Sequence, residues 1–177
     1  MTGLVRSLDD RVDGYFERLR GNPLADRVFY TASSLGEFGL VWVMLALVRA
    51  LRGGATNERA AVRSITGTVV ESVLVNAVLK SVFRRTRPVS DVVHPHPFRQ
   101  PLTSSFPSGH ATAAFCAATL LSDQDPLGPL YFAAAAVVAT SRIHTKIHHA
   151  SDVVGGIAIG TLLGVIGRRI APLAKRS

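Results

Sequence analysis

Apolar residues in this 177-residue chain gather in long blocks instead of alternating with polar ones. Five blocks stand out, at residues 28–51, 64–83, 107–121, 128–141 and 153–167. A helix needs about 20 mostly apolar residues to cross the ~30 Å hydrocarbon core of a bilayer. The first two blocks meet this length, and the last three can span only if their polar ends lie in the headgroup region or face a protected cavity. The pattern predicts an all-α integral membrane bundle of about five transmembrane helices, with a soluble helical bundle as the alternative.

A different pattern precedes the first block. Within residues 1–22, apolar side chains recur at helical spacing among charged ones, namely Leu4, Leu8, Val12, Tyr15, Phe16 and Leu19. This spacing places them on one face of a helix, and such a helix is typical of the membrane surface. We therefore expect an amphipathic interfacial helix at 1–22, followed by a transmembrane domain at 23–177.

The composition excludes two classes of protein. A formal charge of +8 suggests nucleic-acid binding, but the basic residues cluster at the ends of the blocks, as in Arg49, Arg52, Arg168 and Arg169. Membrane helices carry anchoring charge there, beside anionic lipid, so we predict a bilayer and no nucleic acid as partner. Cys116 is the single cysteine, which rules out a disulfide within the chain and a cysteine-based metal site.

Three polar clusters lie at the ends of apolar blocks, at residues 80–88, 107–110 and 141–152. If the blocks cross the membrane in alternating directions, all three clusters meet on one face. The connection at 84–106 is the longest in the chain, and long loops in compact domains are often functional. The sequence therefore predicts one polar site at one end of the bundle.

The clusters carry groups suited to a phosphate. Lys80, Arg87 and Arg142 supply three cations, and arginine offers planar, bidentate donors to phosphate oxygens. The P-S-G-H run starts a helix, so we expect Pro107 in its first turn, with the Ser108 hydroxyl and the Gly109 amide directed at an anion. Arg84 and Arg85 remain open between phosphate contacts and interfacial anchors.

Besides the cations, the clusters contain histidines and a carboxylate that could take part in catalysis. His148 and Asp152 are four residues apart and share one face if a helix has begun, so the carboxylate can fix the imidazole tautomer. His110 belongs to the second polar cluster, at the same predicted end of the bundle. His144 and His149 are interpreted as loop histidines. Gly156, Gly160 and Gly164 continue the same helical row, a small-residue pattern that lets a neighbouring helix approach closely. Two acidic residues lie inside apolar blocks. Glu37 is interpreted as a group at the membrane interface, and Glu71 as a group paired within the bundle.

In order and spacing, the three clusters resemble the signature of the type 2 phosphatidic acid phosphatase (PAP2) superfamily, K-x6-R-P, P-S-G-H and S-R-x5-H-x3-D. The resemblance implies that His148 attacks phosphorus to form a phosphohistidine, that Asp152 orients it, and that His110 protonates the leaving oxygen and then activates water. It implies that the phosphoryl oxygens are held by Lys80, Arg87, Ser108, Gly109 and Arg142. With these cations and few carboxylates, we predict no cofactor and no metal requirement.

The apolar blocks resemble those of the membrane lipid phosphatases of this superfamily, which often have six spans. The expected reaction is hydrolysis of a phosphate or diphosphate monoester on a lipid: phosphatidic acid, phosphatidylglycerol phosphate, polyprenyl diphosphate or a phosphorylated polyprenyl-sugar. The alternatives are vanadate-dependent haloperoxidase-like chemistry and a non-catalytic lipid-binding subunit. The resemblance implies a bacterial plasma membrane and favours its extracytoplasmic face for the site, whereas the charged N-terminus without a signal favours the other face. The balance of Lys and Arg between the two ends does not decide the orientation, and the sequence leaves the oligomeric state open.

Overall fold

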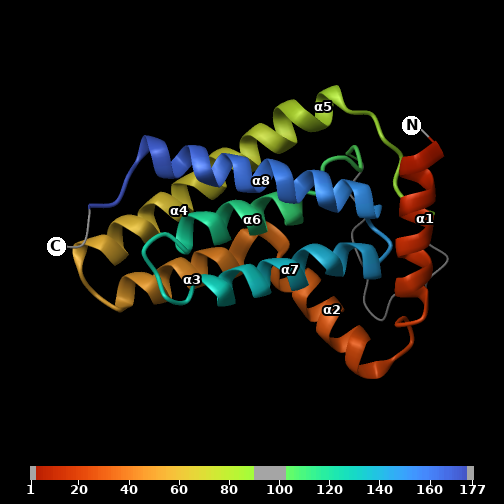
Figure 1. Ribbon diagram of the computed structural model, residues 1–177, viewed down its shortest axis with the longest axis horizontal. Coiled ribbons are helices and arrows are strands. Elements are labelled where there is room, and N and C mark those ends of the chain that lie inside the picture. The colour runs from red at the N-terminus through yellow and green to blue at the C-terminus, as the bar shows by residue number, and fades with distance from the viewer. Residues whose placement is uncertain (1–2, 90–102, 175–177) are drawn as a thin grey trace.

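In the computed structural model, which describes residues 3–89 and 103–174, the chain forms a bundle of helices (Figure 1). The helices are α1 (Gly3–Glu17), α2 (Pro23–Leu35), α3 (Leu40–Leu51), α4 (Ala55–Val73), α5 (Lys80–Val82), α6 (Gly109–Leu121), α7 (Gly128–His144) and α8 (Ala150–Ile170), with a 3₁₀ turn at Glu37–Gly39 and a π-helical stretch at Leu74–Leu79. No strand occurs in these two ranges, so the all-α prediction is confirmed for them.

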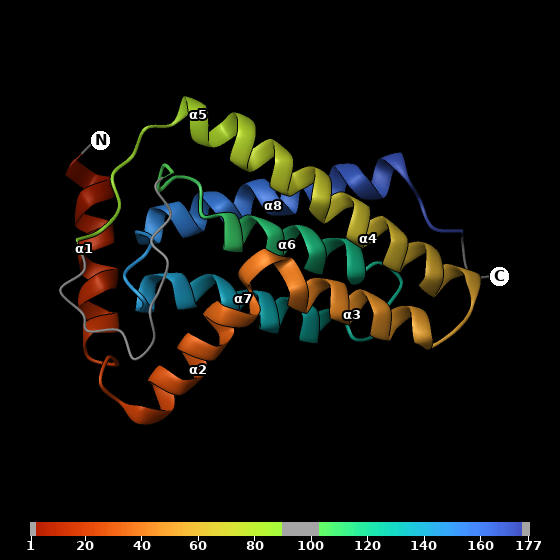
Figure 2. The ribbon, with the colours of Figure 1, turned by 180° about the vertical axis from the view of Figure 1, so that it is seen from behind.

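Helix α6 lies at the centre of the bundle and packs against α4, α7 and α8. Nine of its 13 residues are buried, and its alanines form the core with Trp42, Tyr131 and Val138. Helix α1 runs across one end of the bundle, as both views show (Figure 2). The predicted alternation of the blocks is confirmed, because α5 ends at the same end of the bundle where α6 begins, α7 ends and α8 begins.

Two helices are long and apolar enough to cross a membrane, namely 55–82 and α8. The block predicted at 28–51 is divided into α2 and α3, which meet at an angle of 64° and could make one broken span. The break has a local cause, since Phe38 and Gly39 adopt positive φ angles of 55° and 69° that no α-helix accommodates. Helix α6 is apolar but has only 13 residues, about 20 Å at ~1.5 Å per residue. By length and composition, the described residues therefore give two or three spans, where five were predicted.

The predicted glycine row lies against α6. A Cβ atom added to Gly160 would lie 2.2 Å from the Thr112 carbonyl oxygen, and one on Gly164 would lie 2.5 Å from Thr119 Cβ. The contact at Gly160 is with backbone, which cannot move aside as a flexible side chain can. The two helices are therefore in direct backbone contact along this row.

The glycine contact predicts a stability effect. We expect Gly160→Ala to separate α6 from α8 and to cost about 1–3 kcal/mol, the usual range for an overpacked core. The measurement is the apparent Tm in detergent. Gly14→Ala is the matched control, because a Cβ at Gly14 in α1 meets no atom within 4 Å. Equal melting temperatures for the two variants would contradict the expected strain.

The end of the bundle far from α1 is held together by buried arginines. Arg49 donates to the Leu121 and Asp123 carbonyls, and Arg63 binds the Asp123 carboxylate at 2.8 Å. Arg52 makes a bidentate pair with Asp125. The prediction that Arg49 anchors the chain to lipid headgroups is wrong, because its side chain is fully buried among groups of the protein. Arg52 remains partly exposed beside Asp125, so its contact with headgroups stays a prediction.

Candidate active site

All three polar clusters meet at the end of the bundle that α1 crosses, where α5 and α7 end and α6 and α8 begin. The helix that carries Lys80 ends at Val82, so Arg87 lies in the segment after it. At the start of the next helix, the local structure differs from the prediction. Helix α6 begins at Gly109 with Ser108 as its N-cap residue, so Pro107 lies before the helix and not in its first turn. Residues 90–102 of the predicted loop, with His94 and His96, lie outside the described residues.

His148 is buried in the turn between α7 and α8. Its Nδ1 atom lies 3.7 Å from Asp152 Oδ2 and 3.5 Å from the Ser105 hydroxyl oxygen. Its Nε2 atom lies 3.3 Å from Arg87 Nη1. One ring nitrogen thus faces a carboxylate, while the other faces a cation that can hold an anion.

Burial, followed by the charges of Arg142 and Arg87, lowers the pKa of His148 to about 4, although Asp152 acts in the opposite direction. The imidazole is therefore neutral at pH 7. A neutral imidazole keeps one lone pair on a ring nitrogen, which is what a nucleophile requires. Burial therefore leaves His148 in the protonation state that a nucleophilic imidazole needs.

Asp152 is fixed by several neighbours. Oδ2 accepts hydrogen bonds from the Ser105 hydroxyl at 2.5 Å and from the His149 amide at 2.9 Å, and Oδ1 pairs with Arg85. The His149 contact closes a capping box at the start of α8. The helix begins only at Ala150, so the expected helical register does not extend to His148, and the turn brings it to Asp152 instead.

The predicted phosphate ligands surround the turn that carries His148. Arg142, buried at the end of α7, donates to the Ser33 hydroxyl. Lys80 Nζ lies over the start of α6, since a Cβ on Gly109 would be 3.5 Å from it. The Ser108 hydroxyl is buried without a hydrogen-bond partner among the described residues. These groups lie around a common centre that could hold an anion.

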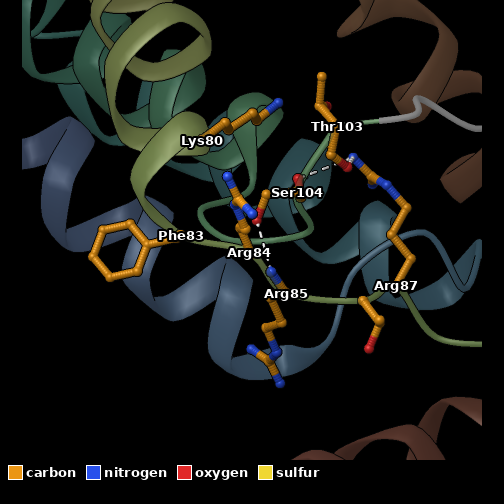
Figure 3. A pocket seen from close by; sticks show the side chains of 8 residues that line it. Lys80, Phe83, Arg84, Arg85, Arg87, Thr103 and Ser104 are labelled. Atoms are coloured by element: carbon orange, nitrogen blue, oxygen red, sulfur yellow. Dashed lines mark hydrogen bonds between the residues drawn. The ribbon is translucent and has the colours of Figure 1, made fainter.

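A pocket of about 470 Å³ opens beside this centre. Figure 3 shows Lys80 and Arg87 on opposite sides of it, with Arg84 beside Lys80. The complete lining consists of Lys80, Phe83, Arg84, Arg85, Thr86, Arg87, Thr103 and Ser104. His110 lies in the first turn of α6, with Nε2 3.2 Å from the Ser33 carbonyl oxygen.

Several supporting residues were missed or left open by sequence reasoning. Arg85 is no lipid anchor, because it pairs with both Asp152 and Asp9. Ser105, whose hydroxyl donates to Asp152, lies two residues before the P-S-G-H run. A hydroxyl so close to the motif was the one feature of the sequence that could have indicated this role. Asp9 lies 143 residues from Asp152, and no local pattern could have connected them.

Two buried titratable residues, His144 and Glu71, lie outside the phosphate centre. His144 is buried, stacks on Phe29 and lies 2.7 Å from Asp26, so it supports the fold outside the phosphate centre. Glu71 is buried with neither carboxylate oxygen hydrogen-bonded within the described residues, so the intrabundle partner predicted for it is not a direct one. Within residues 3–89 and 103–174, no group of three acidic, histidine or cysteine side chains could hold a metal ion.

This arrangement of a helical membrane bundle with a histidine, a carboxylate and several cations at one end matches a known family. A sequence model of the PAP2 superfamily matches residues 61–176, and the chain belongs to this superfamily. The decaprenylphosphoryl-5-phosphoribose phosphatase of Mycobacterium tuberculosis is 32% identical to it over 148 residues, which cover 81% of each protein.

Solved structures share the fold. A transmembrane PAP2-type phosphatidylglycerolphosphate phosphatase from Bacillus subtilis superposes with a TM-score of 0.71 at 24% identity, covering 99% of this chain and 90% of that one. LpxE of Aquifex aeolicus gives a TM-score of 0.68 at 27% identity, covering 94% and 93%. The predicted activity is confirmed at this level: the chain is a membrane lipid phosphatase of the PAP2 superfamily.

Proposed function

We propose that this phosphatase removes the terminal phosphate monoester from a polyprenyl-phosphate-linked phosphosugar, through a phosphohistidine at His148. The observation that carries the reaction type is the pairing of His148, with Asp152 on its Nδ1 side and Arg87 on its Nε2 side. The substrate class is supported by the Mycobacterium tuberculosis relative, which is named for such a lipid and is similar over most of its length.

In the proposed reaction, His148 Nε2 attacks phosphorus, and the N–P bond forms as the bond to the sugar oxygen breaks. His110, which the bound phosphate dianion keeps protonated, gives its proton to that oxygen, so the lipid-linked sugar leaves as an alcohol. His110 then takes a proton from water, which attacks the phosphohistidine and releases inorganic phosphate. Charge that develops on the phosphoryl oxygens is offset by the cations and donors of the site, Lys80, Arg87, Arg142, Ser108 and the Gly109 amide.

The proposal includes five membrane crossings with the site on the extracytoplasmic face of a bacterial plasma membrane, and it divides the chain into an interfacial helix at 1–22 and a catalytic domain at 23–177. Helix α6 buries most of its residues, and a segment enclosed by protein need not match the thickness of the bilayer. Leu4, Leu8 and Tyr15 of α1 are exposed, which supports contact of this helix with the lipid surface.

Arg84 provides a test of the substrate class. It is exposed on the lip of the pocket, and no carboxylate pairs with it within the described ranges. A lipid-linked phosphosugar carries a second negative group, the phosphodiester to its polyprenyl tail, and Arg84 is placed to bind it while the deeper cations hold the monoester.

The experiment is a substrate panel with purified protein in mixed micelles. We expect the phosphorylated polyprenyl-sugar to give the highest kcat/KM, above phosphatidylglycerol phosphate and phosphatidic acid. Arg84→Gln should raise KM about threefold to tenfold for the two diester-bearing lipids, as the loss of a partly exposed charged hydrogen bond predicts, and leave phosphatidic acid unchanged. A preference for phosphatidic acid in the wild-type protein would refute the proposed substrate.

A further inference from the structure

Helix α1 reaches the active site through its own side chains, although it lies outside the three polar clusters. It crosses the end of the bundle (Figures 1 and 2) and contacts α7 and α8, the two helices that flank the turn carrying His148. It is attached on both sides of that turn, by a carboxylate at the start of α8 and by a guanidinium at the end of α7.

The first attachment is made by Asp9, which is only 5% exposed on a helix whose other buried residue is Phe16. Its Oδ1 atom accepts a hydrogen bond from the Ser151 amide at 2.8 Å, and Oδ2 accepts one from the Ser151 hydroxyl at 2.9 Å. A carboxylate at the start of a helix is stabilised by the unpaired amides and the helix dipole. Asp9 therefore fixes the first turn of α8, where Asp152 stands.

Asp9 also reaches Asp152 through a shared cation. Arg85 Nη2 lies 2.7 Å from Asp9 Oδ2, while Nη1 of the same guanidinium contacts Asp152 Oδ1. Without Asp9, the full charge of Arg85 would act on Asp152 alone. Arg85 would then be free to draw the carboxylate away from His148, which lies on its other oxygen at 3.7 Å.

The second attachment is made by Arg20, at the chain segment that follows α1. Arg20 donates to the His144 carbonyl at 2.8 Å and to the Ile143 carbonyl at 2.9 Å, and Asp13 pairs with it at 2.6 Å. A cation is favourable at the C-terminal end of a helix such as α7. Beside these contacts, the Phe16 ring packs edge-on against the rings of Phe29 and His144.

We propose that α1 and Arg20 act as a clamp on the turn between α7 and α8, and that Asp9 is a positioning residue for the His148–Asp152 pair. The proposal rests on the roles given above to His148 and Asp152. The clamp aligns the carboxylate with the imidazole by holding both helix ends and by sharing Arg85. It predicts an effect on turnover that a helix serving only to bind the lipid surface would not have.

The experiment compares Asp9→Asn, Asp9→Glu and the matched control Asp10→Asn in the full-length protein, on whichever lipid of the panel the wild type hydrolyses. Asp10 is the neighbouring carboxylate on α1 and is exposed. We expect Asp9→Asn to lower kcat about tenfold or more, as the loss of a charge-assisted hydrogen bond predicts, with KM little changed. Asp9→Glu, which keeps the charge, should recover part of kcat, and Asp10→Asn should behave as wild type.

Two measurements keep the outcome decisive. Apparent Tm in detergent identifies any loss of folding in Asp9→Asn, and kcat is then taken per folded protein. Binding to anionic vesicles separates anchoring from positioning. A rise in KM with unchanged kcat, or equal losses in Asp9→Asn and Asp10→Asn, would overturn the clamp. Failure of the proposed substrate would not, because the comparison needs only a lipid phosphate that the wild type turns over.

Discussion

Replacement of His148 by alanine is expected to abolish turnover, with a loss of about 10⁴-fold or more, as for the removal of other enzymatic nucleophiles. The reason is its placement: among the described residues, His148 is the histidine that lies between Asp152 and Arg87, whereas His144 is paired with Asp26. The variant should also fail to form an acid-labile phosphoenzyme when it is quenched during turnover of radiolabelled lipid.

His149→Asn is the matched control for this experiment. His149 adjoins His148 and caps α8, and asparagine is itself a good N-cap residue. The control should therefore keep the helix start and most of the activity. If His148→Ala retained a tenth of wild-type turnover, or still formed the phosphoenzyme, the proposed nucleophile would be wrong.

Asp152→Asn is expected to cause the second largest loss, about 10³-fold to 10⁴-fold in kcat, by analogy with neutralisation of the orienting carboxylate in hydrolytic triads. Asparagine keeps the shape of the side chain, but it removes the charge that stabilises the imidazole as the N–P bond forms. It also removes the ion pair with Arg85. The expected split is a large fall in kcat with a small change in KM.

Asp125→Asn provides the control for a buried, arginine-paired aspartate. Asp125 pairs with Arg52 at the far end of the bundle, so its neutralisation should lower the apparent Tm and leave kcat per folded protein unchanged. Equal kcat losses in the two variants would mean that Asp152 acts on the fold rather than on His148.

Sequence reasoning predicted those parts of the molecule that depend on short-range spacing. The number of residues between Lys80 and Arg87, and between His148 and Asp152, can be counted in the sequence. The order of the apolar blocks then brings the clusters to one end of the bundle. The break between α2 and α3 was missed, because hydropathy does not report the positive φ angles at Phe38 and Gly39.

Contacts between distant segments could not be predicted. Neither Asp9 nor Ser33 lies in a motif, and each acquires its role only when α1 and α2 fold onto α7 and α8. The same applies to Arg49. Its position at the end of an apolar block predicts a lipid anchor, but in the folded protein it donates to buried carbonyls. A single sequence shows which charges lie near an apolar block, but not whether they face lipid or protein.

The close approach of α6 and α8 at Gly160 has a consequence for how substrate arrives. Two backbones in van der Waals contact leave no gap for a hydrocarbon chain, so a lipid tail cannot enter between these helices at this point. At the pocket, Val82 and Phe83 beside Lys80 expose apolar side chains. A lipid tail that lay along α5 would keep its headgroup near Lys80, so the exposed side of α5 is better suited to meet a lipid than the contact between α6 and α8.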